Sequence, residues 1–190
     1  MSDTRRNALS LETGLQRVPD SGGTPLVLTR PNRERGEADH LWPHHLPGSC
    51  AVLFTIMAPT GGLETAQVAV LDLNAGTWKS LIPGASQAQY VSSGHLVYVA
   101  GEALWAVALG LSRLELVGVP RVVVPQVLIL PTGTAEFDVA RDGTLVYVTG
   151  GHAAYRRRLV WVDRDGRQEE IAAMPSQAKR RACFTWAALR

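Results

Sequence analysis

The chain alternates short apolar runs with polar turns, and one of these runs recurs. Leu96-Val97-Tyr98-Val99 returns 49 residues later as Leu145-Val146-Tyr147-Val148, and a looser copy, Val52-Leu53-Phe54-Thr55, lies 44 residues before it. Short runs rich in β-branched and aromatic residues predict strands. A repeat of about 40–50 residues predicts a chain assembled from copies of one supersecondary unit.

The segments that follow each run share a plan. Residues 67–72 and 158–163 are each predicted to form a strand, with four apolar residues between polar ends, and each leads into a polar turn that ends in glycine, Gly76 or Gly166. Glycine at the end of such a turn supplies the positive φ that a tight connection between strands requires. A further short run follows each turn, so both segments are predicted to be pairs of strands.

Adding the strand before each apolar run gives four strands per unit. This pattern predicts half a unit at residues 15–29 and three units that begin near Asp39, Gln89 and Glu136. In the middle unit, a longer excursion is expected before the last strand at 121–124. We therefore predict an all-β chain that forms a partial β-propeller of about three and a half four-stranded blades. Because propellers close with about 4–8 blades, an open edge and self-association through open blade edges are expected.

Six motifs, in order along the chain, resemble the WD40-like (PD40) propeller repeats of the TolB-like family, and the resemblance covers about residues 15–172. They are Gly22-Gly23-Thr24-Pro25, His40-Leu41-Trp42-Pro43, Ser93-Gly94-His95-Leu96-Val97-Tyr98, Leu104-Trp105-Ala106-Val107, Asp142-Gly143-Thr144-Leu145-Val146-Tyr147 and Leu159-Val160-Trp161-Val162-Asp163. In bacteria the family includes extracytoplasmic sensor regions fused behind serine/threonine protein kinases. The resemblance implies a module that binds or senses, without catalysis of its own.

The ends of the chain depart from this pattern. We expect a polar N-terminal segment at 1–14, the partial propeller at 15–173 and a basic tail at 174–190. After Ala173 the family would begin another blade, but the sequence does not. The hypothesis is that the chain is a fragment of a larger propeller, ended by a frame shift or a premature stop. Sequencing the encoding DNA beyond this point tests it.

Composition and charge restrict the classes of partner. No apolar run approaches the roughly 20 residues of a membrane span, and the first residues lack the apolar core of a signal peptide. The chain as written is thus expected in the cytoplasm, although full-length relatives are often extracytoplasmic. The net charge of +2 comes from the tail, since residues 1–174 hold 15 basic and 17 acidic residues. No basic patch is interleaved with aromatic residues, so no nucleic-acid partner is predicted.

Propellers bind at the central channel or at the loop faces, so the predicted contact residues come from inner strands. These candidates are Tyr90, His95, Asp138 and Arg141. The partner is expected to be a protein or a small ligand at the propeller face. No cofactor is predicted.

The alternative function is a small serine hydrolase acting on esters. Gly84-Ala85-Ser86-Gln87-Ala88 is one residue short of a nucleophile motif, so Ser86 would act with His95 or His152 and with Asp138 as the acid. Ser86 is expected between blades with no helix after it, whereas a nucleophile elbow needs a strand before the serine and a helix behind it.

A histidine cluster supplies a second, weaker alternative. His40, His44 and His45 offer imidazoles to zinc or nickel. Pro43 and Pro47 prevent the helix that would place His40 and His44 on one face. No metal is therefore expected.

Overall fold

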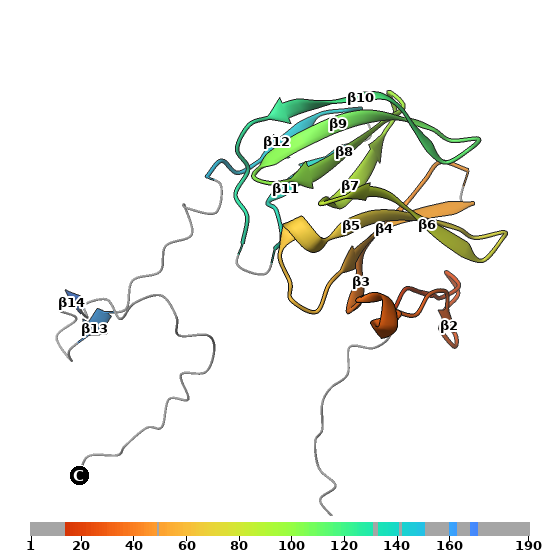
Figure 1. The fold of residues 1–190 in the computed structure, drawn as a ribbon, viewed down its shortest axis with the longest axis horizontal. Coiled ribbons are helices and arrows are strands. Elements are labelled where there is room, and N and C mark those ends of the chain that lie inside the picture. The colour runs from red at the N-terminus through yellow and green to blue at the C-terminus, as the bar shows by residue number, and fades with distance from the viewer. Residues whose placement is uncertain are drawn as a thin grey trace, which may run out of the picture. The chain divides into compact units, whose positions relative to one another are not determined.

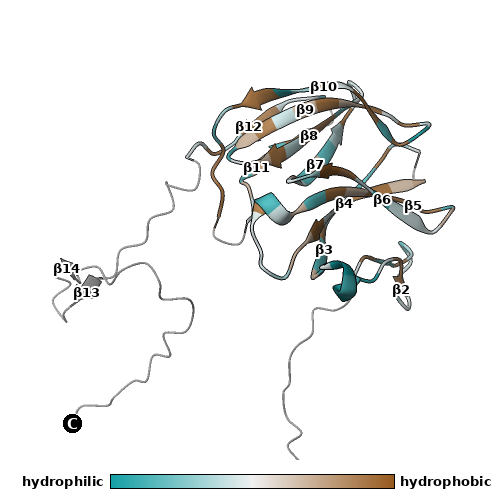
Figure 2. Cartoon of the chain, viewed as in Figure 1, coloured by the Kyte–Doolittle hydropathy of each residue, from teal (hydrophilic) through white to brown (hydrophobic). Residues whose placement is uncertain are grey.

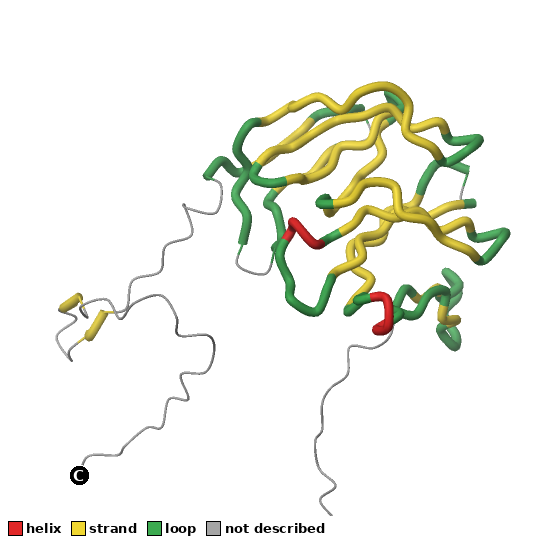
Figure 3. The backbone as a smooth tube through the Cα atoms, in the orientation of Figure 1, coloured by secondary structure: helices red, strands yellow, loops and turns green. Residues whose placement is uncertain are grey.

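The computed structural model describes residues 14–48, 50–130, 133–140 and 142–150, together with the strands β13 (Val160–Val162) and β14 (Gln168–Glu170). The chain divides into two units, Met1–Tyr155 and Arg156–Arg190. Among the described residues the regular structure is strand apart from two short 3-10 turns, η1 (Arg33–Arg35) and η2 (Leu63–Thr65), as Figure 3 shows. The predicted all-β class is confirmed. No helix in this part of the chain is long and apolar enough to cross a membrane.

Two four-stranded antiparallel sheets form most of the first unit (Figure 1). In each sheet, strands that follow one another in sequence lie side by side. The first sheet consists of β3 (Asp39–His45), β4 (Ala51–Met57), β5 (Gln67–Asp72) and β6 (Thr77–Pro83). The second consists of β7 (Ser86–Val91), β8 (His95–Ala100), β9 (Ala103–Gly110) and β10 (Glu115–Val124).

Three two-stranded antiparallel sheets complete the description. β1 (Gln16–Arg17) pairs with β2 (Leu26–Val27), in agreement with the strand pair predicted at 15–29. β11 (Phe137–Val139) pairs with β12 (Leu145–Tyr147), and β13 pairs with β14. None of the described sheets closes on itself.

Two predicted boundaries in the second sheet are wrong. Its first strand begins at Ser86, three residues before the predicted start at Gln89, so Ser86 lies inside a strand rather than between units. The last strand begins at Glu115, six residues before the predicted start at Arg121. Both strands contain a register shift, which interrupts the two-residue alternation on which the sequence prediction depends.

The main core lies between the two larger sheets. Leu53, Val68 and Val70 of the first sheet form one buried cluster with side chains of the second. The second sheet contributes Ala88, Leu96, Tyr98, Val107 and Leu109 to this cluster. The apolar runs of the repeat are therefore the contact between neighbouring units.

The outer face of the first sheet is also covered, which explains why β4 is apolar at nearly every position. Val52, Phe54 and Ile56 alternate with Leu53 along this strand, and they form a separate buried cluster with Leu15 from the N-terminal hairpin. A strand buried on both faces has no solvent-facing position for polar residues. Figure 2 shows brown, hydrophobic stretches among paler and teal ones on the strands of the larger sheets, and teal, hydrophilic colours on η1.

Candidate binding site

β3 and β7, the first strands of the two larger sheets, carry the same irregularity. In β3 the pairing with β4 shifts by one residue between Leu41 and His44, and in β7 the pairing with β8 shifts between Ser86 and Gln89. Each shift contains a residue with positive φ, Trp42 at 49° and Gln87 at 48°. An extra residue in one strand is a β-bulge, which bends the strand and redirects its side chains. The repeat in sequence is therefore also a repeat in backbone geometry.

Strand register identifies which residues are equivalent in successive units. His44 pairs with Leu53, Gln89 with Val97, and Asp138 with Val146. Leu53, Val97 and Val146 are the same position of the recurring run, so their partners occupy the same position of three first strands.

The three equivalent positions meet in space. The Val139 amide donates to the Gln89 side chain, with its nitrogen 3.3 Å from Oε1. The Asp138 carboxylate acts electrostatically on His44. β3 and β7 are also in direct contact.

A cavity of about 540 Å³ opens where the first strands of the two larger sheets end. Two imidazoles, one phenol and one hydroxyl line it, together with apolar surface and backbone. Its lining residues are His44, His45, Leu46, Pro47, Gly48, Tyr90, Ser92 and Val139. A mainly apolar concave surface with a few polar groups is typical of small-molecule sites. None of the lining residues that the structure describes is a lysine or an arginine.

Burial sets the protonation state of His44. Desolvation lowers the pKa of His44 below its usual value, although the Tyr90 backbone and the Asp138 carboxylate favour the protonated ring. A neutral imidazole offers one hydrogen-bond donor and one acceptor. The cavity therefore holds a neutral histidine at neutral pH.

The predicted binding residues have different places relative to this cavity. Tyr90 lines it, and Asp138 lies on β11 beside the lining residue Val139. His95 is exposed, and its Nδ1 atom lies 3.1 Å from the Ser93 hydroxyl in the β7–β8 turn. Arg141 lies outside the described residues.

The histidines considered for a metal do not gather. His40 pairs with Ile56, whereas His44 and His45 pair with Leu53 and Val52 nearer the other end of the strand. Among the described residues there is no group of three or more His, Cys, Asp or Glu side chains placed to hold a metal ion.

The residues of the hydrolase alternative are also separated where they are described. Ser86 is 0% exposed, and its Oγ has no hydrogen-bond partner. It pairs with Val99, whereas His95 pairs with Val91, so the serine and the histidine occupy opposite ends of the β7–β8 hairpin. His152 lies outside the described residues. No described contact favours Ser86 as a nucleophile.

A buried polar chain near the N-terminal hairpin was not predicted from the sequence. Thr29 Oγ1 lies 2.8 Å from His40 Nδ1, and His40 Nε2 lies 3.2 Å from Glu37 Oε2. The His40 side chain is fully buried, so a substrate cannot reach this ring in the folded structure. Its only signal in the sequence is a threonine, a glutamate and a histidine within 12 residues.

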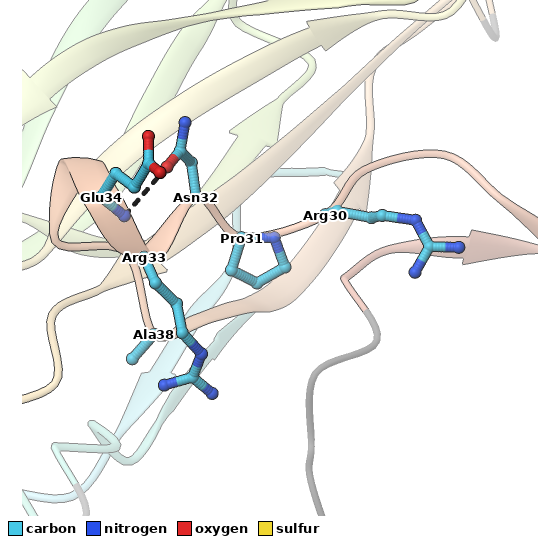
Figure 4. Close-up of a pocket in the computed structure, with 6 residues that line it drawn as sticks. All are labelled: Arg30, Pro31, Asn32, Arg33, Glu34 and Ala38. Carbon is cyan, nitrogen blue, oxygen red and sulfur yellow. Dashed lines mark hydrogen bonds between the residues drawn. The ribbon is translucent and has the colours of Figure 1, made fainter.

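A second cavity, of about 560 Å³, lies beside η1 (Figure 4). Its lining residues are Arg30, Pro31, Asn32, Arg33, Glu34 and Ala38. The Glu34 amide donates to Asn32 Oδ1, which caps the short turn. Arg30 and Arg33 extend in different directions in Figure 4, so their guanidinium groups do not converge on one ligand.

No protein-family model matches the chain. No curated protein matches it either.

Proposed function

We propose that the chain is a non-catalytic binding module, built as part of a β-propeller, whose ligand site is the cavity lined by His44 and Tyr90. The observation that carries the proposal is the equivalence of His44, Gln89 and Asp138 in three successive first strands. Propellers place their first strands around a central channel, so a site shared by these strands fits that architecture.

The order of strands supports the partial propeller. Two complete four-stranded meanders follow one another along the chain, and β11 with β12 begins a third. β13 and β14 follow β11 and β12 along the chain, as β5 and β6 follow β3 and β4. The TolB-like resemblance and a sensing role belong to this same proposal.

The charges around the cavity favour a particular class of ligand. The lining residues include no lysine or arginine, and the Asp138 carboxylate acts on His44 beside it. From the described residues that line the cavity, an anionic ligand would thus meet no permanent positive charge. The Tyr90 ring offers a face for stacking or for a cation. We infer a small ring-bearing ligand that is uncharged or positively charged.

Three probes of similar size test this inference. Benzylamine, benzyl alcohol and benzoate carry one ring each and differ in charge, and saturation-transfer NMR measures their binding to the full chain. We expect benzylamine to bind at least as tightly as benzyl alcohol and both to bind more tightly than benzoate. Fragments of this size bind with Kd of about 1 mM.

Two variants identify the site. Tyr90→Ala is expected to weaken the binding of both benzylamine and benzyl alcohol. Asp138→Asn is expected to weaken the binding of benzylamine alone. Tyr147→Ala, on the exposed surface of β12, is the matched control and is expected to change neither. If the Tyr90→Ala variant binds all three probes as tightly as the parent chain does, the proposed site is wrong. If benzoate binds most tightly and still requires Tyr90, the site stands and the ligand class is wrong.

A further inference from the structure

The N-terminal hairpin is held to the first sheet by a chain of buried hydrogen bonds. The Leu15 amide donates to Thr29 Oγ1 at 2.9 Å, and that oxygen lies 2.8 Å from His40 Nδ1 on β3. His40 Nε2 lies 3.2 Å from Glu37 Oε2, which also accepts from the Asn32 amide at 2.7 Å. The chain therefore connects the start of the hairpin to the first strand of the sheet.

The direction of each bond follows from the chemistry of the groups. An ionised carboxylate only accepts, so Nε2 of His40 carries the proton that points at Glu37. In a neutral ring Nδ1 is then an acceptor, and the Thr29 hydroxyl donates to it. The same hydroxyl oxygen accepts from Leu15, so every member of the chain is satisfied while His40 is neutral.

Protonation of His40 breaks this arrangement. A proton on Nδ1 makes that atom a donor facing Thr29 Oγ1, which then receives two donors and loses the acceptor for its own hydrogen. The aromatic neighbours from β4 and β6 are Phe54, with ring centroids 4.9 Å apart, and Trp78, at 6.0 Å. Neither ring offers an acceptor to replace Nδ1.

The charged groups that face His40 are Glu37 and Asp39, and both favour the protonated ring. Burial outweighs them and lowers the pKa of His40 below its usual value. The neutral ring is therefore the form that the closed structure selects, and the closed structure is disfavoured once the ring gains a proton.

We propose that Thr29, His40 and Glu37 form a proton-operated latch that holds the N-terminal hairpin on the first sheet and releases it when His40 is protonated. Release uncovers the apolar outer face of the sheet, where Leu15 contacts the cluster of Val52, Phe54 and Leu71. The proposal does not depend on the ligand site.

Hydrogen exchange of the full chain across pH tests the latch, with NMR titration of the His40 ring as the second readout. The protection factor of the Leu15 amide is expected to fall by up to tenfold per pH unit below pH 6.5. The protection factor of Leu104, in the interior of the second sheet, follows global stability and is expected to fall less than that of Leu15 over the same range.

Three variants separate the latch from general acid sensitivity. His40→Gln is expected to abolish the pH dependence of Leu15 protection, and Glu37→Gln to move it to lower pH. His95→Gln, at an exposed histidine, is the matched control and is expected to leave it unchanged. The latch is wrong if Leu15 stays protected while His40 titrates, or if Leu15 and Leu104 lose protection by the same factor.

Discussion

The side chain of Gln87 is bonded to the backbone of Ala135 in both directions. Its Oε1 accepts from the Ala135 amide at 2.6 Å, and its Nε2 donates to the Ala135 carbonyl at 3.4 Å. These are the two backbone groups that a neighbouring strand would use. The Gln87 amide, displaced by the bulge, donates to Thr55 Oγ1 of the first sheet at 3.0 Å. One residue therefore links both larger sheets to the segment that leads into β11.

Gln87→Glu is expected to lower the free energy of unfolding by about 1–3 kcal/mol. The glutamate keeps the shape of the side chain but cannot donate to the Ala135 carbonyl, and it places a carboxylate against that oxygen. Urea denaturation measures the change. Gln126→Glu, at an exposed position, is the matched control, and an equal effect in the two variants would contradict the role of Gln87.

Thr55 is fully buried and accepts the amide of Gln87 across the interface between the larger sheets. Thr55→Val keeps the shape and leaves that amide without an acceptor, so we expect a loss of about 1–3 kcal/mol in the free energy of unfolding. Thr55→Ser retains the oxygen and is expected to lose less. Equal losses for valine and serine would show that the hydroxyl contributes nothing.

Leu53 on β4 and Leu96 on β8 are fully buried and belong to the same cluster of the main core. Changing either residue to alanine is expected to lower the free energy of unfolding by about 2–5 kcal/mol, because the packed neighbours cannot fill the cavity that is left. Thermal unfolding compares the stability of each variant with that of the parent chain. Leu26→Ala, at an exposed strand position, is expected to cost much less.

Stability is expected to decrease as the pH falls below 6.5. The pKa of His44 is lowered in the folded chain, so the unfolded chain binds that proton more tightly. The contribution of the neutral ring is complete above pH 6.5 and is lost as the pH falls toward the folded pKa. Urea midpoints measured between pH 7.5 and 5.5 are expected to depend less on pH in His44→Gln than in the parent chain. An unchanged dependence would contradict the burial of this ring.

β10 is an edge strand with exposed valines, and Val119 is 82% exposed. An exposed apolar edge promotes pairing with a second copy. Sedimentation at increasing concentration is expected to show self-association that Val119→Lys reduces. A chain that remains monomeric at every concentration contradicts this prediction.

The sequence predicts much of this fold because its repeat lies in the residues that form the core. Leu53 and Val97 occupy the same position of the recurring run, both are buried, and the strands around them follow the predicted order. The first full unit was predicted to begin near Asp39, and β3 begins there. The start at Ser86 was missed because the bulge near Gln87 interrupts the alternation that marks a strand.

The candidate site was only partly accessible from the sequence. Tyr90 was predicted because inner strands of a propeller face its channel, and it lines the cavity. The bonds of Gln87 were missed because they join residues 48 positions apart. The contact of His40 with Thr29 spans 11 residues and depends on how the hairpin folds back. Local patterns contain no information about either contact.

Chemical-shift mapping with benzylamine tests the proposed site most directly. In a titration of the ¹⁵N-labelled chain, the amides of His45, Tyr90, Ser92 and Val139 are expected to shift together and saturably. The amide signals of Arg33 and Glu34, beside the other cavity, are expected to keep their chemical shifts. Saturable shifts confined to η1 or to β10, with Tyr90 and Val139 unmoved, would contradict a binding site at the first strands.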